Sequence, residues 1–385
     1  ISATTAAVFI DRARQVASQA RANEAEAKRA AFGWFQKAQR TIDVMATGVS
    51  DVLQNLPGTD RLRVQLLEIA ASSYEEFSAQ ASPDPQVQRE RAHALVRVGD
   101  IQRRIGKYPE AARAYEDARR AYSGLAMALS DDRDVQLDLA LCSRKLGDTC
   151  VDQRDYAAAR KAFEEARKQL DGARNSPERS QQEIEWKISL GLLEREGKNL
   201  PQAEHWFREA HAQAVSNKPA DQPESLEQLA LIQSLLGGVL ADLGNHQDAI
   251  RFLKESLASN ERLTGLPSSQ PSYWEELAFA ELTLARTLMP LGQCNEQSEL
   301  LKRAVAHYDG LLQNVAVLPH LRRNRAIALA HLGLLHHAAH RNQDARRLMD
   351  DAIAELSRLA DVPTAGGGEF EPLANAHMIR GRILR

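Results

Sequence analysis

The sequence predicts an all-α protein, built as a solenoid of about six long helical pairs after an N-terminal helical hairpin. Three observations support this prediction. A pattern of small and large residues recurs at intervals of 44 to 48 residues. Turn and helix-capping residues fall between the copies. Aromatic residues make up only 5% of the 385 residues while alanine is plentiful, which favours close helix packing over a β-rich fold.

The repeated pattern is clearest in the segment Leu146–Arg167. There Gly147 is followed after twelve residues by Ala159. Phe163 comes four residues later, and Ala166 three residues after that. The pattern recurs, more loosely in the last three copies, from Gly99, Gly191, Gly237, Ala285 and Gly333. A period of this length indicates stacked supersecondary units that share a core.

Each copy is expected to form two helices that cross closely. A small residue at the first position lets the second helix approach, and the aromatic or leucine residue fills the remaining space. Within units, Gly106 and Gly244 suit a helix C-terminus, and Pro201 suits the first turn of the next helix. Each unit therefore reads as a helix, a tight turn and a second helix.

These residues resemble the tetratricopeptide repeat, in which small, small, aromatic and small residues recur at the same offsets. The resemblance covers Arg89 to Leu359, within an array expected over residues 83–361, and implies a right-handed superhelical solenoid. The period is longer than the usual 34 residues of the family. Its usual tryptophan, four residues before the first small position, is replaced by Leu95, Ser143, Lys187, Gln233, Glu281 and Leu329.

The N-terminal region is predicted to form a helical hairpin over residues 31–82. An apolar stripe with period 3.5 follows Ala31, Phe35, Ala38, Ile42, Met45, Val49, Val52 and Leu56. A dimerising coiled coil that continues back toward Ile1 is the alternative. Residues 1–30 are expected to form a juxtamembrane-like helix, and "ISATTAAVFI" is either the end of a membrane span or a frayed helix start.

A second resemblance covers about Ile1 to Leu125. The blocks "AFGWFQKAQRTIDVMATGVSDVL", "LPGTDRLRVQLLEIAASSYEEF" and "RERAHALVRVGDIQRRIGKYPEAARAYEDA" are similar to the region after the membrane span in planctomycete-type serine/threonine protein kinases. That resemblance implies a bacterial, membrane-anchored protein with its repeats outside the cytoplasm. However, residues 11–40 hold seven Lys/Arg against three Asp/Glu, and such a basic flank favours the cytoplasmic side.

The chain itself shows no catalytic signature. It lacks a Gly-rich phosphate loop, a V-A-I-K lysine, an H-R-D loop and a D-F-G motif. His336 and His340 are spaced to share a metal, but no Glu follows His336, so a partly exposed helix face is favoured over a metal site. The three cysteines are expected to be buried small hydrophobic residues. We therefore expect no enzyme activity, cofactor or metal, and the net charge of −3 argues against nucleic acid.

In the tetratricopeptide repeat family, the first helix of each unit lines a concave surface. The residues matching those positions predict a partner-binding groove that is charged in the first units and more apolar later. The candidates are Asp100, Arg103, Arg144, Asp148, Asp152, Leu192, Leu282, Arg286 and Leu334. The Lys and Asn pairs that clamp a peptide carboxylate in chaperone-binding members are absent. We expect a protein or peptide partner.

Residues 362–385 are expected to form a Gly-rich linker and a capping helix from about Phe370 to Arg385. The predicted function is that of a non-catalytic interaction scaffold or sensor, the repeat portion of a membrane-anchored kinase. A free-standing cytoplasmic scaffold without a kinase is the alternative.

Overall fold

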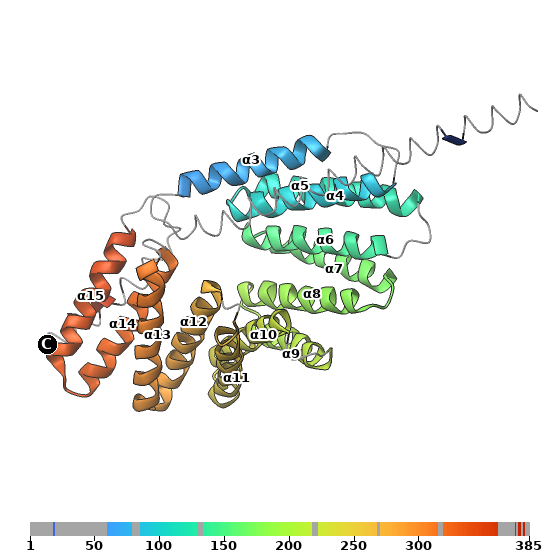
Figure 1. Cartoon of the computed structure of the whole chain (residues 1–385). Coiled ribbons are helices and arrows are strands. Elements are labelled where there is room, and N and C mark those ends of the chain that lie inside the picture. The colour runs from blue at the N-terminus through green and yellow to red at the C-terminus, as the bar shows by residue number, and fades with distance from the viewer. Residues whose placement is uncertain are drawn as a thin grey trace, which may run out of the picture.

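The computed structural model is helical across the part of the chain that it describes. Figure 1 shows the helices side by side in a curved array that runs from α3 to α15. Within this described part, no residue is in a strand, and no helix has the length and apolar character needed to cross a bilayer. The structure describes residues 60–78, 85–128, 134–217, 222–267, 270–314 and 319–360, together with residues 18, 19, 374, 376–378, 380 and 381.

Consecutive helices form six pairs, which confirms the predicted solenoid. Units one to six are α4 (Pro85–Arg104) with α5 (Tyr108–Ala128), α6 (Asp134–Asp152) with α7 (Tyr156–Gly172), α8 (Pro177–Glu196) with α9 (Leu200–Ser216), α10 (Pro223–Asp242) with α11 (His246–Thr264), α12 (Pro271–Leu288) with α13 (Cys294–Asn314), and α14 (Pro319–Ala338) with α15 (Asn342–Ala360). A short 3-10 helix, η2 (Met289–Leu291), follows α12.

One helix of the predicted N-terminal hairpin lies among the described residues. This is α3 (Asp60–Ser78), whose Leu67 and Tyr74 are buried in a cluster that includes Val98 of α4. The helix expected over residues 31–56, and nearly all of the segment before it, lie outside the described residues. The hairpin therefore stays a prediction.

At the other end, part of the C-terminal segment lies against the last unit. Ala376 is 1% exposed and belongs to a buried cluster with Leu329 and Leu356. Arg380 Nε lies 2.5 Å from Asp350 Oδ1 of α15. The rest of the expected capping helix lies mostly outside the described residues, so its extent stays a prediction.

The small first position of the repeat permits direct contact between the two helices of a unit. A methyl group added at Gly147 would lie 2.4 Å from Cε1 of Phe163, and one added at Gly191 would lie 2.4 Å from Cε1 of Phe207. Both rings are fully buried. Carbon atoms cannot approach so closely, because their favourable separation is about 3.5–4.0 Å. Glycine is therefore required here by packing, since its backbone is in an ordinary helix.

Polar bridges occupy the position where the family usually has tryptophan. In four consecutive units this position bonds to the residue 26 places later, on the second helix. The pairs are Ser143 Oγ with Gln169 Oε1 at 2.8 Å, Lys187 Nζ with Gln213 Oε1 at 2.8 Å, Gln233 Oε1 with Ser259 Oγ at 3.4 Å, and Glu281 Oε2 with His307 Nδ1 at 3.0 Å. A directional bond thus replaces the missing ring inside each of these units.

The bridge of unit five is the one of these four that contains a carboxylate, Glu281. Glu281 has no exposed side-chain surface, and its second oxygen lies 2.8 Å from Arg303 Nε. Both partners come from α13, so the charge is balanced within the unit. This arrangement explains how a carboxylate can occupy a position that is apolar in the first and last units, at Leu95 and Leu329.

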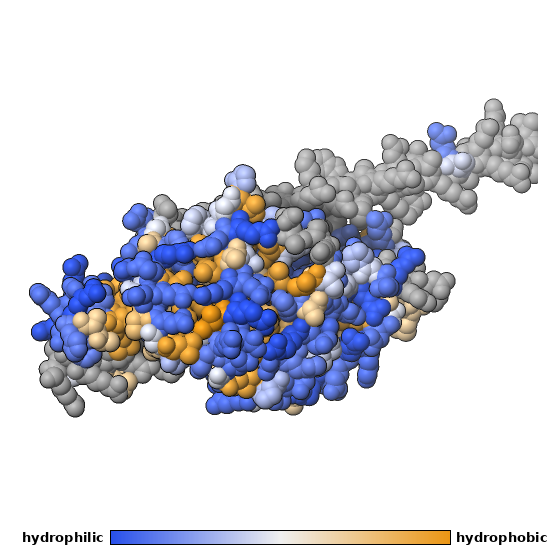
Figure 2. Space-filling view, turned by 90° about the horizontal axis from the view of Figure 1, so that it is seen from below, coloured by the Kyte–Doolittle hydropathy of each residue, from blue (hydrophilic) through white to orange (hydrophobic). Residues whose placement is uncertain are grey.

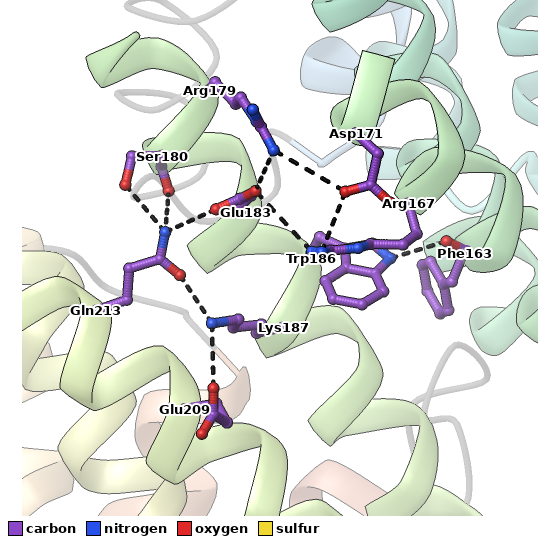
Figure 3. Close-up of polar contacts among 10 residues, drawn as sticks. All are labelled: Phe163, Arg167, Asp171, Arg179, Ser180, Glu183, Trp186, Lys187, Glu209 and Gln213. Atoms are coloured by element: carbon purple, nitrogen blue, oxygen red, sulfur yellow. Dashed lines mark hydrogen bonds and ion pairs between the residues drawn. The ribbon is translucent and has the colours of Figure 1, made fainter. Parts of the chain in front are cut away.

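Figure 3 shows how unit three is joined both internally and to unit two. Gln213 of α9 accepts from Lys187 and donates to Glu183 Oε2 at 3.0 Å, both on α8. Trp186 of α8 donates its indole N–H to the backbone oxygen of Phe163 on α7 at 2.8 Å. Phe163 therefore has two roles: its ring packs inside unit two, and its backbone oxygen accepts the hydrogen bond from unit three.

Every turn inside a unit contains one residue with positive φ. These residues are Gly106, Arg154, Lys198, Gly244, Gly292 and His340. At Lys198 the chain forms a Schellman motif, because Lys198 N donates to Arg195 O and Asn199 N donates to Glu194 O. Three of the six residues are not glycine, although this conformation costs a side chain roughly 1–2 kcal/mol. Their positions follow the repeat, so the turn geometry is fixed by the architecture.

Adding a methyl group at the crowded first position should destabilise the fold. We expect Gly237→Ala to lower the free energy of unfolding by about 1–3 kcal/mol, because the new Cβ would lie 2.6 Å from Cγ of Leu253. Its neighbour Gly238 has no atom within 4 Å of such a methyl, so Gly238→Ala should gain about 0.5–1 kcal/mol from helix propensity. Urea unfolding followed by circular dichroism measures both, and equal effects would contradict the packing argument.

Relieving the strained turn of unit three should stabilise the protein. Lys198 is exposed and has φ 60°, so Lys198→Gly should raise the stability by about 0.5–1 kcal/mol. The exposed Lys168, inside helix α7, provides the control, since Lys168→Gly should cost about 1 kcal/mol. A melting temperature that falls for both variants would show that the turn is not strained.

Candidate functional site

The first helices of the units lie on the inner side of the curved array. Contacts between first helices of consecutive units join α6 to α8, α10 to α12 and α12 to α14. An array bends toward the side on which successive helices are closer together. The inner face is therefore formed by first helices, as the sequence predicted.

The charged candidates of the first units are paired with one another across the inner face. Four ion pairs join first helices of neighbouring units. They are Arg89–Asp138 at 2.8 Å, Asp100–Lys145 at 2.6 Å, Arg103–Asp152 at 2.6 Å and Arg144–Glu185 at 2.6 Å. Arg144 also contacts Asp148 at 3.1 Å. The structure thus brings all five charged candidates of units one and two into internal pairs.

Asp100 also accepts a hydrogen bond from a tyrosine on the second helix of the same unit. The Tyr115 hydroxyl donates to Asp100 Oδ1 at 2.6 Å. Burial, and then the charge of Asp100, raise the pKa of Tyr115 above its usual range. The phenol therefore stays protonated and continues to donate at neutral pH. The charges of this region stabilise the array and leave little unbalanced charge for a partner.

The apolar candidates are less accessible than the sequence suggested. Leu282 is 2% exposed and belongs to the core shared by units four to six, so including it in a partner-binding groove was wrong. The same repeat position is also buried at Val96 and Ile188, which shows that it faces a neighbouring helix. Leu192 and Leu334 are half-buried.

A cavity of about 680 Å³ lies across the first helices of units four to six. Its walls come mainly from α10, α12, η2 and α14, with single residues from α11 (His246), α15 (Leu356) and the C-terminal segment (Ala376). Phe279 and Met289 line it and are 42% and 40% exposed. Arg286, the candidate from unit five, also lines it. A separate and smaller cavity of about 420 Å³ is lined by three other predicted residues, Asp100, Arg103 and Asp152.

The cavity of units four to six contains two charged residues, Asp242 and Arg286, that form no ion pair with each other in the described structure. Arg286 is exposed and makes no ion pair with any other residue that the structure describes. Burial of the imidazole, and then the nearby Arg286 guanidinium, lower the pKa of His331 to about 4. The Nδ1 atoms of His331 and His246 are buried and have no hydrogen-bond partner in the described structure. Both histidines line the cavity.

Sequence reasoning missed this role of His331. His331 belongs to the run "HLGLLHHAAH" together with His336 and His340, for which the sequence favoured a partly exposed helix face. The available signal was its position directly after Ala330, one of the inner-face positions of the repeat. Ala330 and His331 both line the cavity, and they are part of the wall that α14 forms.

The other chemically reactive residues do not form a site. No group of three metal-ligating side chains occurs among the described residues, and His336 Nδ1 instead lies 3.5 Å from Asp344. Cys142 and Cys150 are buried as expected, whereas Cys294 is exposed, which corrects that part of the expectation. Cys294 begins α13, where the first turn of a helix faces solvent.

Comparisons with known proteins agree with this architecture. A family model described as "Tetratricopeptide repeat" matches residues 229–271, which include most of α10 and all of α11. No curated protein matches the sequence.

Three solved structures have similar folds at low sequence identity. BtubC (BKLC) from P. vanneervenii is 18% identical over 65% of this chain and 91% of its own, with a TM-score of 0.52. The STAND protein PH0952 from Pyrococcus horikoshii is 14% identical over 84% of this chain and 48% of its own, with a TM-score of 0.55. The apo form of RapI is 11% identical over 83% of this chain and 82% of its own, with a TM-score of 0.54.

Stacked helical pairs with a shared core define an α-solenoid repeat protein. Residues 229–271 match the tetratricopeptide repeat model, and the fold as a whole is similar to those of the three solved structures.

The buried histidine of the cavity should make stability depend on pH. An unfolded histidine takes up a proton near pH 6.5, whereas His331 in the folded state does so only near pH 4. Between these values the unfolded state binds more protons, so stability falls as the pH is lowered. Between pH 7 and pH 5, His331→Gln should lose about 1–2 kcal/mol less than the parent.

Urea unfolding at the two pH values measures this difference. The exposed His205 provides the control, because His205→Gln should keep the slope of the parent. A His331→Gln variant with an unchanged slope would contradict the assignment.

Proposed function

We propose that the chain is a non-catalytic interaction scaffold or sensor that binds a protein or peptide on the inner face of its solenoid. The observation that carries this proposal is the cavity of units four to six, where Arg286 has no ion pair in the described structure. A solvent-exposed cavity that combines apolar walls with unsatisfied polar groups is typical of a binding site.

The surface of the cavity suits an elongated partner. It extends over three successive first helices, whose axes are about 10 Å apart by ordinary helix packing. Exposed Phe279 and Met289 provide apolar contact along it. Figure 2, a view from below, shows apolar patches between the polar ridges of the array. An extended or helical peptide fits such a surface better than a compact small molecule does.

The comparisons support a sensing role by analogy. The P. horikoshii protein is described as having a tetratricopeptide repeat sensor, and this chain spans about half of its length. In a sensor, partner binding would be passed to another part of the protein. In a scaffold, binding itself would be the function.

The resemblance of the N-terminal blocks supports a more specific proposal. The chain would be the repeat portion of a bacterial, membrane-anchored serine/threonine kinase, with its anchor upstream of Ile1 and its repeats outside the cytoplasm. A free-standing adaptor in the cytoplasm is the alternative. The coding sequence upstream of Ile1 distinguishes them, since the kinase proposal requires a kinase domain followed by an apolar span.

The outer face of α3 supports a contact with the preceding segment. Leu62 and Ile69 are 53% and 65% exposed on the side away from α4. We propose that the apolar stripe of residues 31–56 covers this face, either within one chain as a hairpin or between two copies as a dimer. Light scattering separates these arrangements by their mass.

Photo-crosslinking tests the proposed inner-face binding. Benzoylphenylalanine at Phe279 should form adducts with a partner from lysate of the source organism, because this ring lines the cavity. The same residue at Trp274 provides a matched control, since both aromatic side chains are on α12 and similarly exposed, at 39% and 42%. Trp274 instead contacts His307 of α13. Adducts at Trp274 but not at Phe279 would contradict inner-face binding.

A further inference from the structure

Charge is distributed unequally between the two halves of the inner face. In units one to three, four ion pairs join first helices of neighbouring units across the inner face. In unit five, Arg286 forms no ion pair with any residue placed by the structure, and Asp242, the acidic residue that lines the same cavity, does not pair with it. A fixed cation without a counter-charge attracts an anion most strongly where part of the water is excluded.

We propose that the cavity of units four to six binds a peptide through an acidic side chain, Asp or Glu, that is flanked by a large apolar side chain. Arg286 would pair with the carboxylate, and His331 would hydrogen-bond to it through Nδ1. This inference rests on the proposed function and specifies the partner of the same site.

The polar atoms of the cavity fit a carboxylate. A guanidinium has only donors, so Arg286 requires an acceptor. His331 Nδ1 is buried without a partner, and in a neutral imidazole this nitrogen can carry the proton and donate. A carboxylate has two oxygens and can accept from both residues at once. The side chain that lacks a partner in the free protein would gain one in the complex.

The apolar walls fit a neighbouring aliphatic or aromatic side chain. Phe279 and Met289 are both more than one third exposed, and Ile327 of α14 also lines the cavity. Covering two such side chains is worth about 25 cal/mol per Å² of apolar area. Methionine and phenylalanine also adapt to side chains of different shapes. The apolar contact would therefore add affinity, and the carboxylate would add selectivity.

The location of Arg286 favours an acidic side chain over a chain terminus. Arg286 is on α12, the middle of the three first helices, and the cavity continues to Asp242 on α10 and to Ile327 on α14. A peptide that crosses all three helices passes Arg286 with chain on both sides. About ten extended residues, roughly 33 Å, are enough for this path.

Selection from a random peptide library tests the proposal directly. Peptides of about twelve residues, displayed without a free C-terminus, are selected on the whole chain and then synthesised with both ends blocked. We expect enrichment of Asp or Glu next to Leu, Ile, Met or Phe. Fluorescence anisotropy then measures the dissociation constant of the strongest peptide for the parent and for each variant.

A double-mutant cycle connects the acid of the peptide to Arg286. Arg286→Gln in the protein, or Glu→Gln in the peptide, should each weaken binding about tenfold. The two changes together should weaken it little more than one alone, because both remove the same contact. Arg347 is exposed on α15 with no ion pair in the described residues, so Arg347→Gln should leave binding unchanged. Equal melting temperatures show that the variants fold.

Three outcomes would overturn the inference. Selected peptides could lack acids, Arg286→Gln could leave affinity unchanged, or the two changes could be additive. If such peptides still compete with crosslinking at Phe279, the inner face binds peptides and only the acidic partner is wrong. If they do not compete, the proposed inner-face function fails as well.

Discussion

The close contact between a small residue on the first helix and a large buried side chain on the second fixes the spacing of each helical pair. In units one to three this contact is a glycine against an aromatic ring. At Gly147 and Gly191 the ring of the second helix lies where any side chain of the first helix would have to be. Once the two helices of a unit are this close, their outer surfaces present a continuous apolar face to the next pair. The stacking of the units, the curvature of the array and the shape of its inner face therefore all depend on the short distance between the two helices of each unit.

Much of this architecture could be predicted from residue spacing, because the spacing of small residues reports directly on packing. The offsets of twelve, four and three residues identified the pairs correctly. Polar bridges such as Lys187–Gln213 were not predicted, since they depend on two residues 26 positions apart that differ in every unit. Because the residue types at this repeat position change from unit to unit, the bridges became recognisable only when the structure showed which atoms are in contact.

The candidate site was predicted less well, for a related reason. Repeat positions identify the inner face but do not show whether a charged residue points to solvent or reaches the next unit. Arg103 and Arg144 reach acidic residues on neighbouring first helices, whereas Arg286 does not. Leu282 shows that an apolar residue at an inner position can instead be buried in the core between neighbouring helices. Distinguishing these cases requires the distance between helices, which residue types alone do not give.

The junction of units four and five differs from the junctions among units one to three. In units one to three, ion pairs join successive first helices across the inner face. Between units four and five, Lys254–Glu296 and Arg303–Glu261 join the second helices, and no ion pair among the described residues joins α10 to α12. The inner edge of this junction can therefore open or close while its outer edge stays connected, which suits a solenoid that tightens around a bound partner at the cavity.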